Sequence, residues 1–212
     1  LKNKKSLCGG FSTLFLALGK KMNLEIEKVT GYSKGYGYSP SKRYKDTDHV
    51  WNIIKIDGQW KVFDATWGSG SIKIINGQLL SKKEFNEYWF NVSPYAAVFS
   101  HLPQNSSFTM VQPAIDLNTY ENFPVIDKEY FRLGFDAEDT YRHLRENNAL
   151  LFPKCYPTGT YSKAILAPKY AVLHNNKSYD FEFYIPKGIS VSMVDASNNW
   201  TYFAREKGKF KL

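Results

Sequence analysis

Three residues of this chain have the types and the setting that catalysis by a thiol nucleophile needs. Cys8 lies in the segment Ser6–Phe11, directly before an amphipathic stretch, and His49 and Asp64 follow within one short region. In such a site the imidazole takes the proton of the thiol, while the carboxylate fixes the imidazole tautomer and stabilises the imidazolium. We therefore expect Cys8 to be the nucleophile, His49 the base and Asp64 the orienting group.

The segment that carries Cys8 has the pattern of a helix. Apolar residues recur at helical spacing at Phe11, Leu14, Phe15, Leu18 and Met22. This spacing predicts a helix from about Leu7 to Met22, with Cys8 in its first turn. Backbone N–H groups in a first turn have no intrahelical partner, and the positive end of the helix dipole favours a thiolate. A cysteine at a helix start is more often a packing residue, so its assignment depends on the other two groups.

A β-hairpin is predicted around His49 and Asp64. Apolar and aromatic stretches at residues 49–56 and 59–65 flank Asp57-Gly58, a dipeptide typical of two-residue type I′ turns. Counting outward from this turn pairs Ile56 with Gln59, Trp51 with Asp64 and His49 with Thr66. Since side chains alternate between faces, His49 and Asp64 then lie on one face as diagonal neighbours, about 7–8 Å apart at the backbone.

Other elements of the first half follow from shorter signals. We expect a strand over residues 24–32, an exposed loop over 33–47, a second hairpin turning at Asn76-Gly77, and core positions at Trp89, Phe90, Phe99 and Leu102. Ser81–Glu84 resembles a helix capping box, and Ser93-Pro94 resembles the cap and first residue of a short helix.

The second half has a different texture. From about Glu129 onward, short apolar runs at 164–166, 179–185 and 189–194 are separated by turn signals, including one at 157–159. This spacing is typical of a small antiparallel β-sandwich. The sequence thus predicts an α+β protein with a catalytic domain over residues 1–128 and a β-sandwich accessory domain over 129–212.

The motifs around the three candidate residues resemble the transglutaminase-like superfamily. The resemblance rests on Cys8–Phe11, His49–Asn52 and Asp64–Gly68, and Gly31–Tyr38 and Phe99–Pro103 are similar to the kyphoscoliosis peptidase branch of it. It implies a papain-like fold and a triad of Cys8, His49 and Asp64, in which the thiol attacks a peptide or carboxamide carbonyl to form a thioester. His101 matches a family position, where a packing role and a functional one both stay open.

The resemblance leaves three functions to be distinguished. The first is a cysteine hydrolase of the peptidase type with a protein or peptide substrate. The second is a transglutaminase or deamidase acting on protein glutamine. The third is a pseudoenzyme that serves as a protein-binding scaffold, because residues 2–7 contain no Gln or Trp as a side-chain oxyanion donor.

Composition limits the remaining classes. The 212 residues carry a formal net charge of +8, but Lys and Arg are scattered among acidic and apolar residues, which argues against a nucleic-acid site. Two cysteines make no disulfide framework, and no Cys-x-x-Cys or other ligand spacing predicts a metal or cofactor. No stretch is long and apolar enough to span a membrane, so we expect a soluble chain, cytoplasmic or exported after loss of an upstream segment. Oligomeric state is left open.

Overall fold

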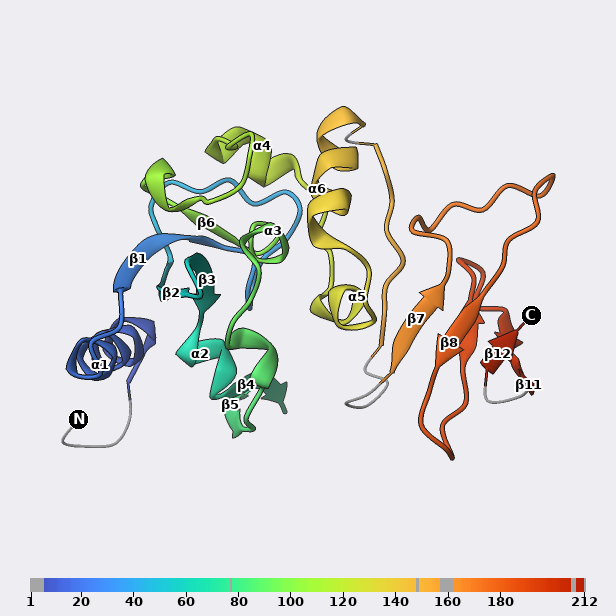
Figure 1. Cartoon of the computed structure of the whole chain (residues 1–212), viewed down its shortest axis with the longest axis horizontal. Coiled ribbons are helices and arrows are strands. Elements are labelled where there is room, and N and C mark those ends of the chain that lie inside the picture. The colour runs from blue at the N-terminus through green and yellow to red at the C-terminus, as the bar shows by residue number, and fades with distance from the viewer. Residues whose placement is uncertain (1–5, 77, 148, 157–161, 207–208, 212) are drawn as a thin grey trace. The chain divides into compact units, whose positions relative to one another are not determined.

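The computed structural model describes residues 6–76, 78–147, 149–156, 162–206 and 209–211, and Figure 1 shows the path of the chain. The contacts divide the chain into two compact units, residues 1–125 and 126–212. Helices occur together with antiparallel sheets, so the predicted α+β class is confirmed. The placing of a domain boundary between residues 128 and 129 stays a prediction.

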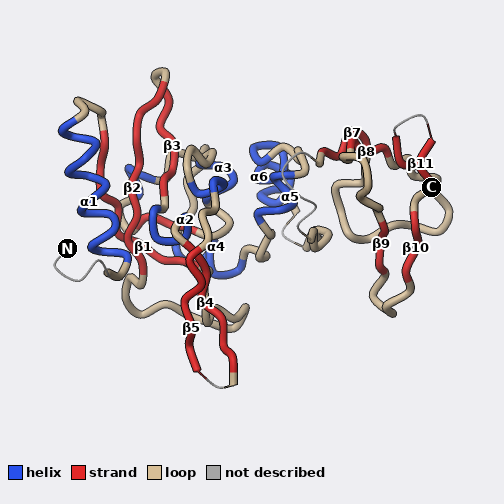
Figure 2. The backbone as a smooth tube through the Cα atoms, turned by 90° about the horizontal axis from the view of Figure 1, so that it is seen from below, coloured by secondary structure: helices blue, strands red, loops and turns tan. Residues whose placement is uncertain are grey.

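The N-terminal unit is built on a four-stranded antiparallel sheet with the strand order β3-β2-β1-β6. Figure 2 shows α1 running alongside β1 and β2 of this sheet. The elements of the unit are α1 (Cys8–Lys21), β1 (Ile26–Ser33), β2 (His49–Ile56), β3 (Gln59–Phe63), α2 (Ala65–Gly68), β4 (Gly70–Ile75), β5 (Gln78–Lys83), η1 (Glu87–Trp89), α3 (Pro94–Ala97), β6 (His101–Pro103), η2 (Ser106–Phe108) and α4 (Leu117–Asn122).

Helix α1 forms where the apolar spacing predicted it, and Cys8 is its first residue. Phe15 and Leu16 of the helix pack against a core cluster that includes Ile54 of β2 and Phe63 of β3. Full burial of such a side chain stabilises a fold by about 1.5–3 kcal/mol, and the partly buried Phe15 and Leu16 each contribute a fraction of that. This packing fixes α1 on the sheet, and with it the position of Cys8.

The hairpin of β2 and β3 has the predicted turn and register. Ile56 pairs with Gln59 and Ile53 with Val62. Asp57 and Gly58 both have positive φ, at 50° and 77°, as a type I′ turn requires. The ladder ends earlier than predicted, however, because Phe63 is the last residue of β3.

Gly31 allows a close approach between β1 and two of its neighbours. A Cβ at this position would lie 2.1 Å from the carbonyl oxygen of Leu102 on β6 and 2.6 Å from the ring of Trp51 on β2. We expect Gly31→Ala to lower the free energy of unfolding by about 1–3 kcal/mol, since a backbone oxygen must shift. Urea unfolding measures this loss. Gly9→Ala is the matched control, because its Cβ meets nothing within 4 Å, and an equal effect in both variants would contradict the prediction.

Ser33 ends β1, and residues 34–47 contain no helix or strand, as predicted, but they are not uniformly exposed. The exposed fractions of Lys34 and Tyr44 are only 7% and 9%. Lys34 Nζ donates to the carbonyl oxygen of Phe123 at 2.7 Å, and the Tyr44 hydroxyl donates to that of Ser33 at 2.6 Å. The prediction of an exposed loop is confirmed for most of the segment and was wrong for Lys34 and Tyr44, which contact residues near 120 that are distant in sequence.

Burial lowers the pKa of Lys34 to about 7, although the nearby Glu121 carboxylate acts in the opposite direction. Between pH 7 and the ordinary lysine pKa of 10.5, the unfolded chain therefore holds a proton that the folded chain has lost. The contribution of Lys34 to the free energy of unfolding therefore rises with pH across this window, by at most about 1.4 kcal/mol per pH unit.

We expect Lys34→Met to flatten this rise in stability. Urea unfolding at pH 7, 8 and 9 measures it, below the range in which neighbouring tyrosines ionise, since burial raises the pKa of Tyr38, Tyr44 and Tyr120 above 10.0. Lys28→Met, on the exposed side of β1, is the matched control and keeps the slope. A slope unchanged by Lys34→Met would contradict the buried-amine account.

Three further expectations can be compared with the structure. Strands β4 and β5 pair with Ile75 opposite Gln78, which confirms the second hairpin. The capping box at 81–84 was wrong, because β5 continues to Lys83. Ser93 does precede the short helix α3, with Pro94 as its first residue, so that expectation is confirmed.

In the C-terminal unit the described residues form two small antiparallel sheets, with the strand orders β11-β12-β8-β7 and β10-β9. It also contains two helices within residues 128–146, which the β-sandwich prediction lacked. The turn predicted at 157–159 lies outside the described residues. The elements are α5 (Lys128–Arg132), α6 (Ala137–Glu146), β7 (Lys163–Leu166), β8 (Glu182–Tyr184), β9 (Ser192–Val194), β10 (Trp200–Tyr202), β11 (Ala204–Glu206) and β12 (Lys209–Lys211).

Among the described residues, no helix combines the length and the apolar character that crossing a membrane requires. Cys8 and Cys155 are both free thiols.

Candidate active site

Cys8 occupies the first position of α1 and is half-buried. Leu7 precedes it without a side-chain cap, and the carbonyl oxygen of Leu7 accepts the N–H groups of Gly10 and Phe11 at 3.0 and 3.2 Å. The N–H groups of Cys8 and Gly9 have no carbonyl oxygen within the helix to which they can donate. The thiol therefore lies at the positive end of α1, beside backbone donors that the helix itself does not use.

Asn52 ties the start of α1 to the sheet. Its side-chain nitrogen donates to the carbonyl oxygen of Ser12, one turn after Cys8, at 3.1 Å and to that of Glu27 on β1 at 3.2 Å. Asn52 has no exposed surface. Such a buried amide holds α1 and the two central strands in one arrangement.

The structure brings His49 and Asp64 into direct contact. His49 begins β2, and its Nε2 lies 2.6 Å from Asp64 Oδ2. Asp64 follows β3 and caps α2, where its Oδ1 accepts the N–H groups of Thr66 and Trp67 at 2.8 and 3.0 Å. The pairing of His49 with Thr66 was therefore wrong: Asp64 ends the strand, and Thr66 belongs to α2.

His101 joins the same carboxylate, and the sequence did not single it out as a site residue. It begins β6, and its Nε2 lies 3.1 Å from Asp64 Oδ2, the oxygen that His49 also contacts. Its Nδ1 lies 2.8 Å from Ser100 Oγ. A polar Ser-His pair inside the apolar run Phe99–Leu102 was the available signal. It could not reveal a partner 37 residues away.

The carboxylate and both imidazoles are almost fully buried, with exposed fractions of 0% for Asp64, 6% for His49 and 2% for His101. Burial by itself raises the pKa of the Asp64 carboxyl, but the hydrogen bonds from His101 and His49 outweigh it and hold this pKa well below its usual range. Burial lowers the pKa of His101. At neutral pH we therefore assign an ionised Asp64 that accepts an Nε2–H from each imidazole, and a neutral His101.

Three tryptophans surround the two imidazoles. Trp67 stacks on His49, with ring centroids 5.4 Å apart, and lies 4.5 Å from His101. Trp51 and Trp89 lie 5.0 and 5.2 Å from His101. These rings hold the imidazole rotamers and keep the region poor in water, which strengthens the hydrogen bonds within it.

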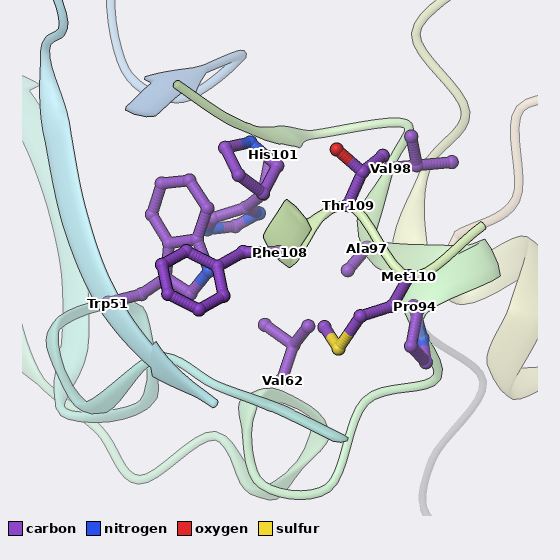
Figure 3. Close-up of a pocket in the computed structure, with 10 residues that line it drawn as sticks. Trp51, Val62, Pro94, Ala97, Val98, His101, Phe108, Thr109 and Met110 are labelled. Atoms are coloured by element: carbon purple, nitrogen blue, oxygen red, sulfur yellow. The ribbon is translucent and has the colours of Figure 1, made fainter. Parts of the chain in front are cut away.

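Trp51 and His101 also border a small cavity. Figure 3 shows its lining, which is mostly apolar. Thr109 Oγ1 is buried there without a hydrogen-bond partner. The labelled residues are Trp51, Val62, Pro94, Ala97, Val98, His101, Phe108, Thr109 and Met110.

His49, Asp64 and His101 are also of the types that bind metal ions, and their ligand atoms lie within 4.8 Å of one another. Two ligands of a tetrahedral zinc ion, each about 2.0–2.1 Å from the metal, lie roughly 3.3 Å apart. The 2.6 Å between His49 Nε2 and Asp64 Oδ2 is a hydrogen-bond distance instead. We interpret the cluster as a hydrogen-bonded network, and the absence of a metal stays a prediction.

This arrangement allows His49 to act as a base, because Asp64 fixes which of its ring nitrogens carries the proton. With Nε2–H directed at Asp64, His49 carries its lone pair on Nδ1, the nitrogen that takes a proton. No hydrogen bond to Cys8 Sγ occurs among the described residues. A side-chain oxyanion donor upstream of Cys8 would lie among residues 2–7. Residues 2–5 of this segment lie outside the described range.

Comparisons with known proteins agree with the motifs. No protein-family model matches the chain. It is 30% identical to human kyphoscoliosis peptidase over 135 residues, which are 63% of this chain and 20% of that protein. Hillarin of Drosophila melanogaster is 23% identical over 141 residues, 61% of this chain and 17% of that protein. The Lim and transglutaminase domain protein ltd-1 of Caenorhabditis elegans is 22% identical over 140 residues, 61% and 19% respectively.

The chain thus spans no more than about a fifth of the length of these relatives. Over about 60% of its own length it is related to transglutaminase-like proteins of the kyphoscoliosis peptidase branch, as its motifs predicted.

Proposed function

We propose that this chain is a cysteine-dependent hydrolase or acyltransferase that acts on peptide or glutamine carboxamide bonds of proteins, with the peptidase type as the leading candidate. The observation that carries the proposal is the buried 2.6 Å contact between His49 Nε2 and Asp64 Oδ2, because it leaves Nδ1 of His49 as the basic nitrogen. Cys8 at the start of α1 supplies the thiol in the proposed papain-like core.

The reaction proceeds in two halves. His49 Nδ1 takes the Cys8 proton, and Sγ attacks the substrate carbonyl carbon to form a tetrahedral intermediate. First-turn N–H groups of α1 stabilise the oxyanion. His49 then returns the proton to the leaving amine or ammonia, and a thioester remains on Cys8. Water completes hydrolysis, whereas a primary amine completes transfer, and in either case His49 again takes the proton of the attacking group.

Two alternatives follow from specific observations. The printed name of the nematode relative includes a transglutaminase domain, which favours amine transfer or deamidation. The absence of a hydrogen bond to Cys8 Sγ among the described residues favours a scaffold that binds proteins without turnover. In all three cases the C-terminal unit, proposed as a β-sandwich, acts as a support or recognition domain, and no cofactor takes part.

Product analysis distinguishes these functions. The whole chain is incubated with reduced casein and a fluorescent primary amine, and mass spectrometry records new peptide termini, incorporated amine and deamidated glutamine. We expect new termini that disappear with Cys8→Ala. Amine incorporation or deamidation would instead assign the transferase alternative, and the absence of all three products would contradict catalysis.

A further inference from the structure

Asp64 is held by more hydrogen bonds than a triad requires. Oδ1 accepts two backbone N–H groups of α2, and Oδ2 lies within hydrogen-bond distance of His49 and of His101. An ionised carboxylate offers about four acceptor positions, so every position is taken. Rotation of the carboxylate would break at least one of these bonds in a place without water, since Asp64 has no exposed surface.

Ser100 decides which nitrogen of His101 carries a proton. Its hydroxyl lies 2.8 Å from His101 Nδ1 and 3.2 Å from the carbonyl oxygen of Ala97, but it has one proton to donate. If it donates to Ala97, Nδ1 must also be protonated, and His101 becomes a buried cation. If it donates to Nδ1, His101 is neutral, with its proton on Nε2 and directed at Asp64.

The surroundings favour the neutral form. The titratable groups that act on His101 are Asp64, His49 and the more distant Asp48. Asp48 accepts hydrogen bonds from Lys42 and from the N–H of Ser33, so its charge is compensated. Burial is the largest influence on His101 and opposes protonation.

From this geometry we propose that His101, oriented by Ser100, is a positioning residue that fixes the Asp64 carboxylate toward His49. The role rests on the proposed function, in which His49 becomes an imidazolium during each half-reaction. A neutral His101 supplies a hydrogen bond without a second positive charge, so the full charge of Asp64 remains available to His49.

If His101 served only for packing, its side chain would have to meet a different requirement than in the positioning role. His101 lies among tryptophan rings and beside the cavity of Figure 3, so any residue of similar volume would satisfy packing. The positioning role requires an N–H at the place of Nε2. Glutamine carries its amide nitrogen near that place, whereas the amide of asparagine reaches only about as far as Nδ1.

The test compares His101→Gln with His101→Asn in the whole chain, and neither amide side chain is larger than the imidazole that it replaces. The rate of alkylation of Cys8 by iodoacetamide is followed from pH 4 to 9 by peptide-resolved mass spectrometry. We expect the acid limb of the profile to move up by about 1–3 pH units in His101→Asn. His101→Gln should restore the wild-type profile. The ¹³Cγ resonance of Asp64 is followed over the same pH range as a readout independent of Cys8, and it should titrate higher in His101→Asn.

The outcomes separate the two claims. Fast labelling that depends on His49, with the same pH profile in His101→Asn as in the wild type, overturns the positioning role alone. Slow labelling in the wild type, equal to that of His49→Ala, overturns the proposed function and the positioning role with it. Equal shifts in His101→Gln and His101→Asn, with both variants folded, would show packing and also overturn the positioning role.

Discussion

Cys8→Ala is expected to lower turnover by about 10⁶-fold, the scale seen when the nucleophile of a covalent mechanism is removed. Alanine preserves the helix start, because Cys8 makes no capping hydrogen bond in α1 and alanine is a strong helix former. The free energy of unfolding should therefore change little while cleavage or transfer of casein disappears. Turnover is measured by the rate of new peptide termini or incorporated amine.

The chain contains its own matched control for this variant. Cys155 is the second thiol, and burial raises its pKa to about 11. It therefore stays a protonated, weak nucleophile at neutral pH. We expect Cys155→Ala to leave turnover unchanged. Loss of activity in Cys155→Ala, or its retention in Cys8→Ala, would contradict the assignment of the nucleophile.

Asp64→Asn is expected to lower turnover by about 10⁴-fold, as loss of the charge beside a catalytic imidazole does in comparable triads. Asparagine keeps an oxygen that can cap α2 in place of Oδ1. Its amide N–H then faces His49 Nε2, so His49 must adopt the tautomer with its proton on Nδ1. Nδ1 then has no lone pair to accept the thiol proton. The imidazolium also loses its counter-charge.

Asp116→Asn is the matched control, because Asp116 Oδ1 caps α4 by accepting the N–H of Thr119 at 2.8 Å. Both variants replace a capping carboxylate, but only Asp64 contacts His49. Turnover is measured at pH 7, and folding is checked by urea unfolding. A loss smaller than about tenfold in Asp64→Asn, or an equal loss in Asp116→Asn, would remove Asp64 from the proposed mechanism.

Local patterns predicted the parts of the site that depend on local structure. The apolar spacing placed Cys8 in the first turn of α1, and Asp57-Gly58 gave the register from Ile56–Gln59 to Ile53–Val62. The alternation rule failed beyond Phe63 because Asp64 is a good N-cap residue, and its carboxylate starts α2 instead of continuing the strand. The contact with His49 forms nevertheless, through side chains that bridge the end of the ladder.

Contacts distant in sequence could not be predicted in this way. His101 reaches Asp64 because β6 pairs with β1, with Ser33 opposite His101, and no spacing within either segment encodes that pairing. Lys34 is buried for the same reason, through Phe123. Helices α5 and α6 did have local signals in their caps Asp127 and Asp136. Their apolar residues are too few to outweigh the strand-like texture that follows.

The central claim, that His49 activates the Cys8 thiol, is tested most directly by the pH dependence of Cys8 alkylation in the wild type and in His49→Ala. An activated thiol is labelled rapidly well below about pH 8.5, the range in which ordinary cysteines ionise, and this labelling should be lost in His49→Ala. Cys155, measured in the same samples, serves as the unreactive reference. Labelling of Cys8 that follows an ordinary thiol profile in both proteins would contradict the account.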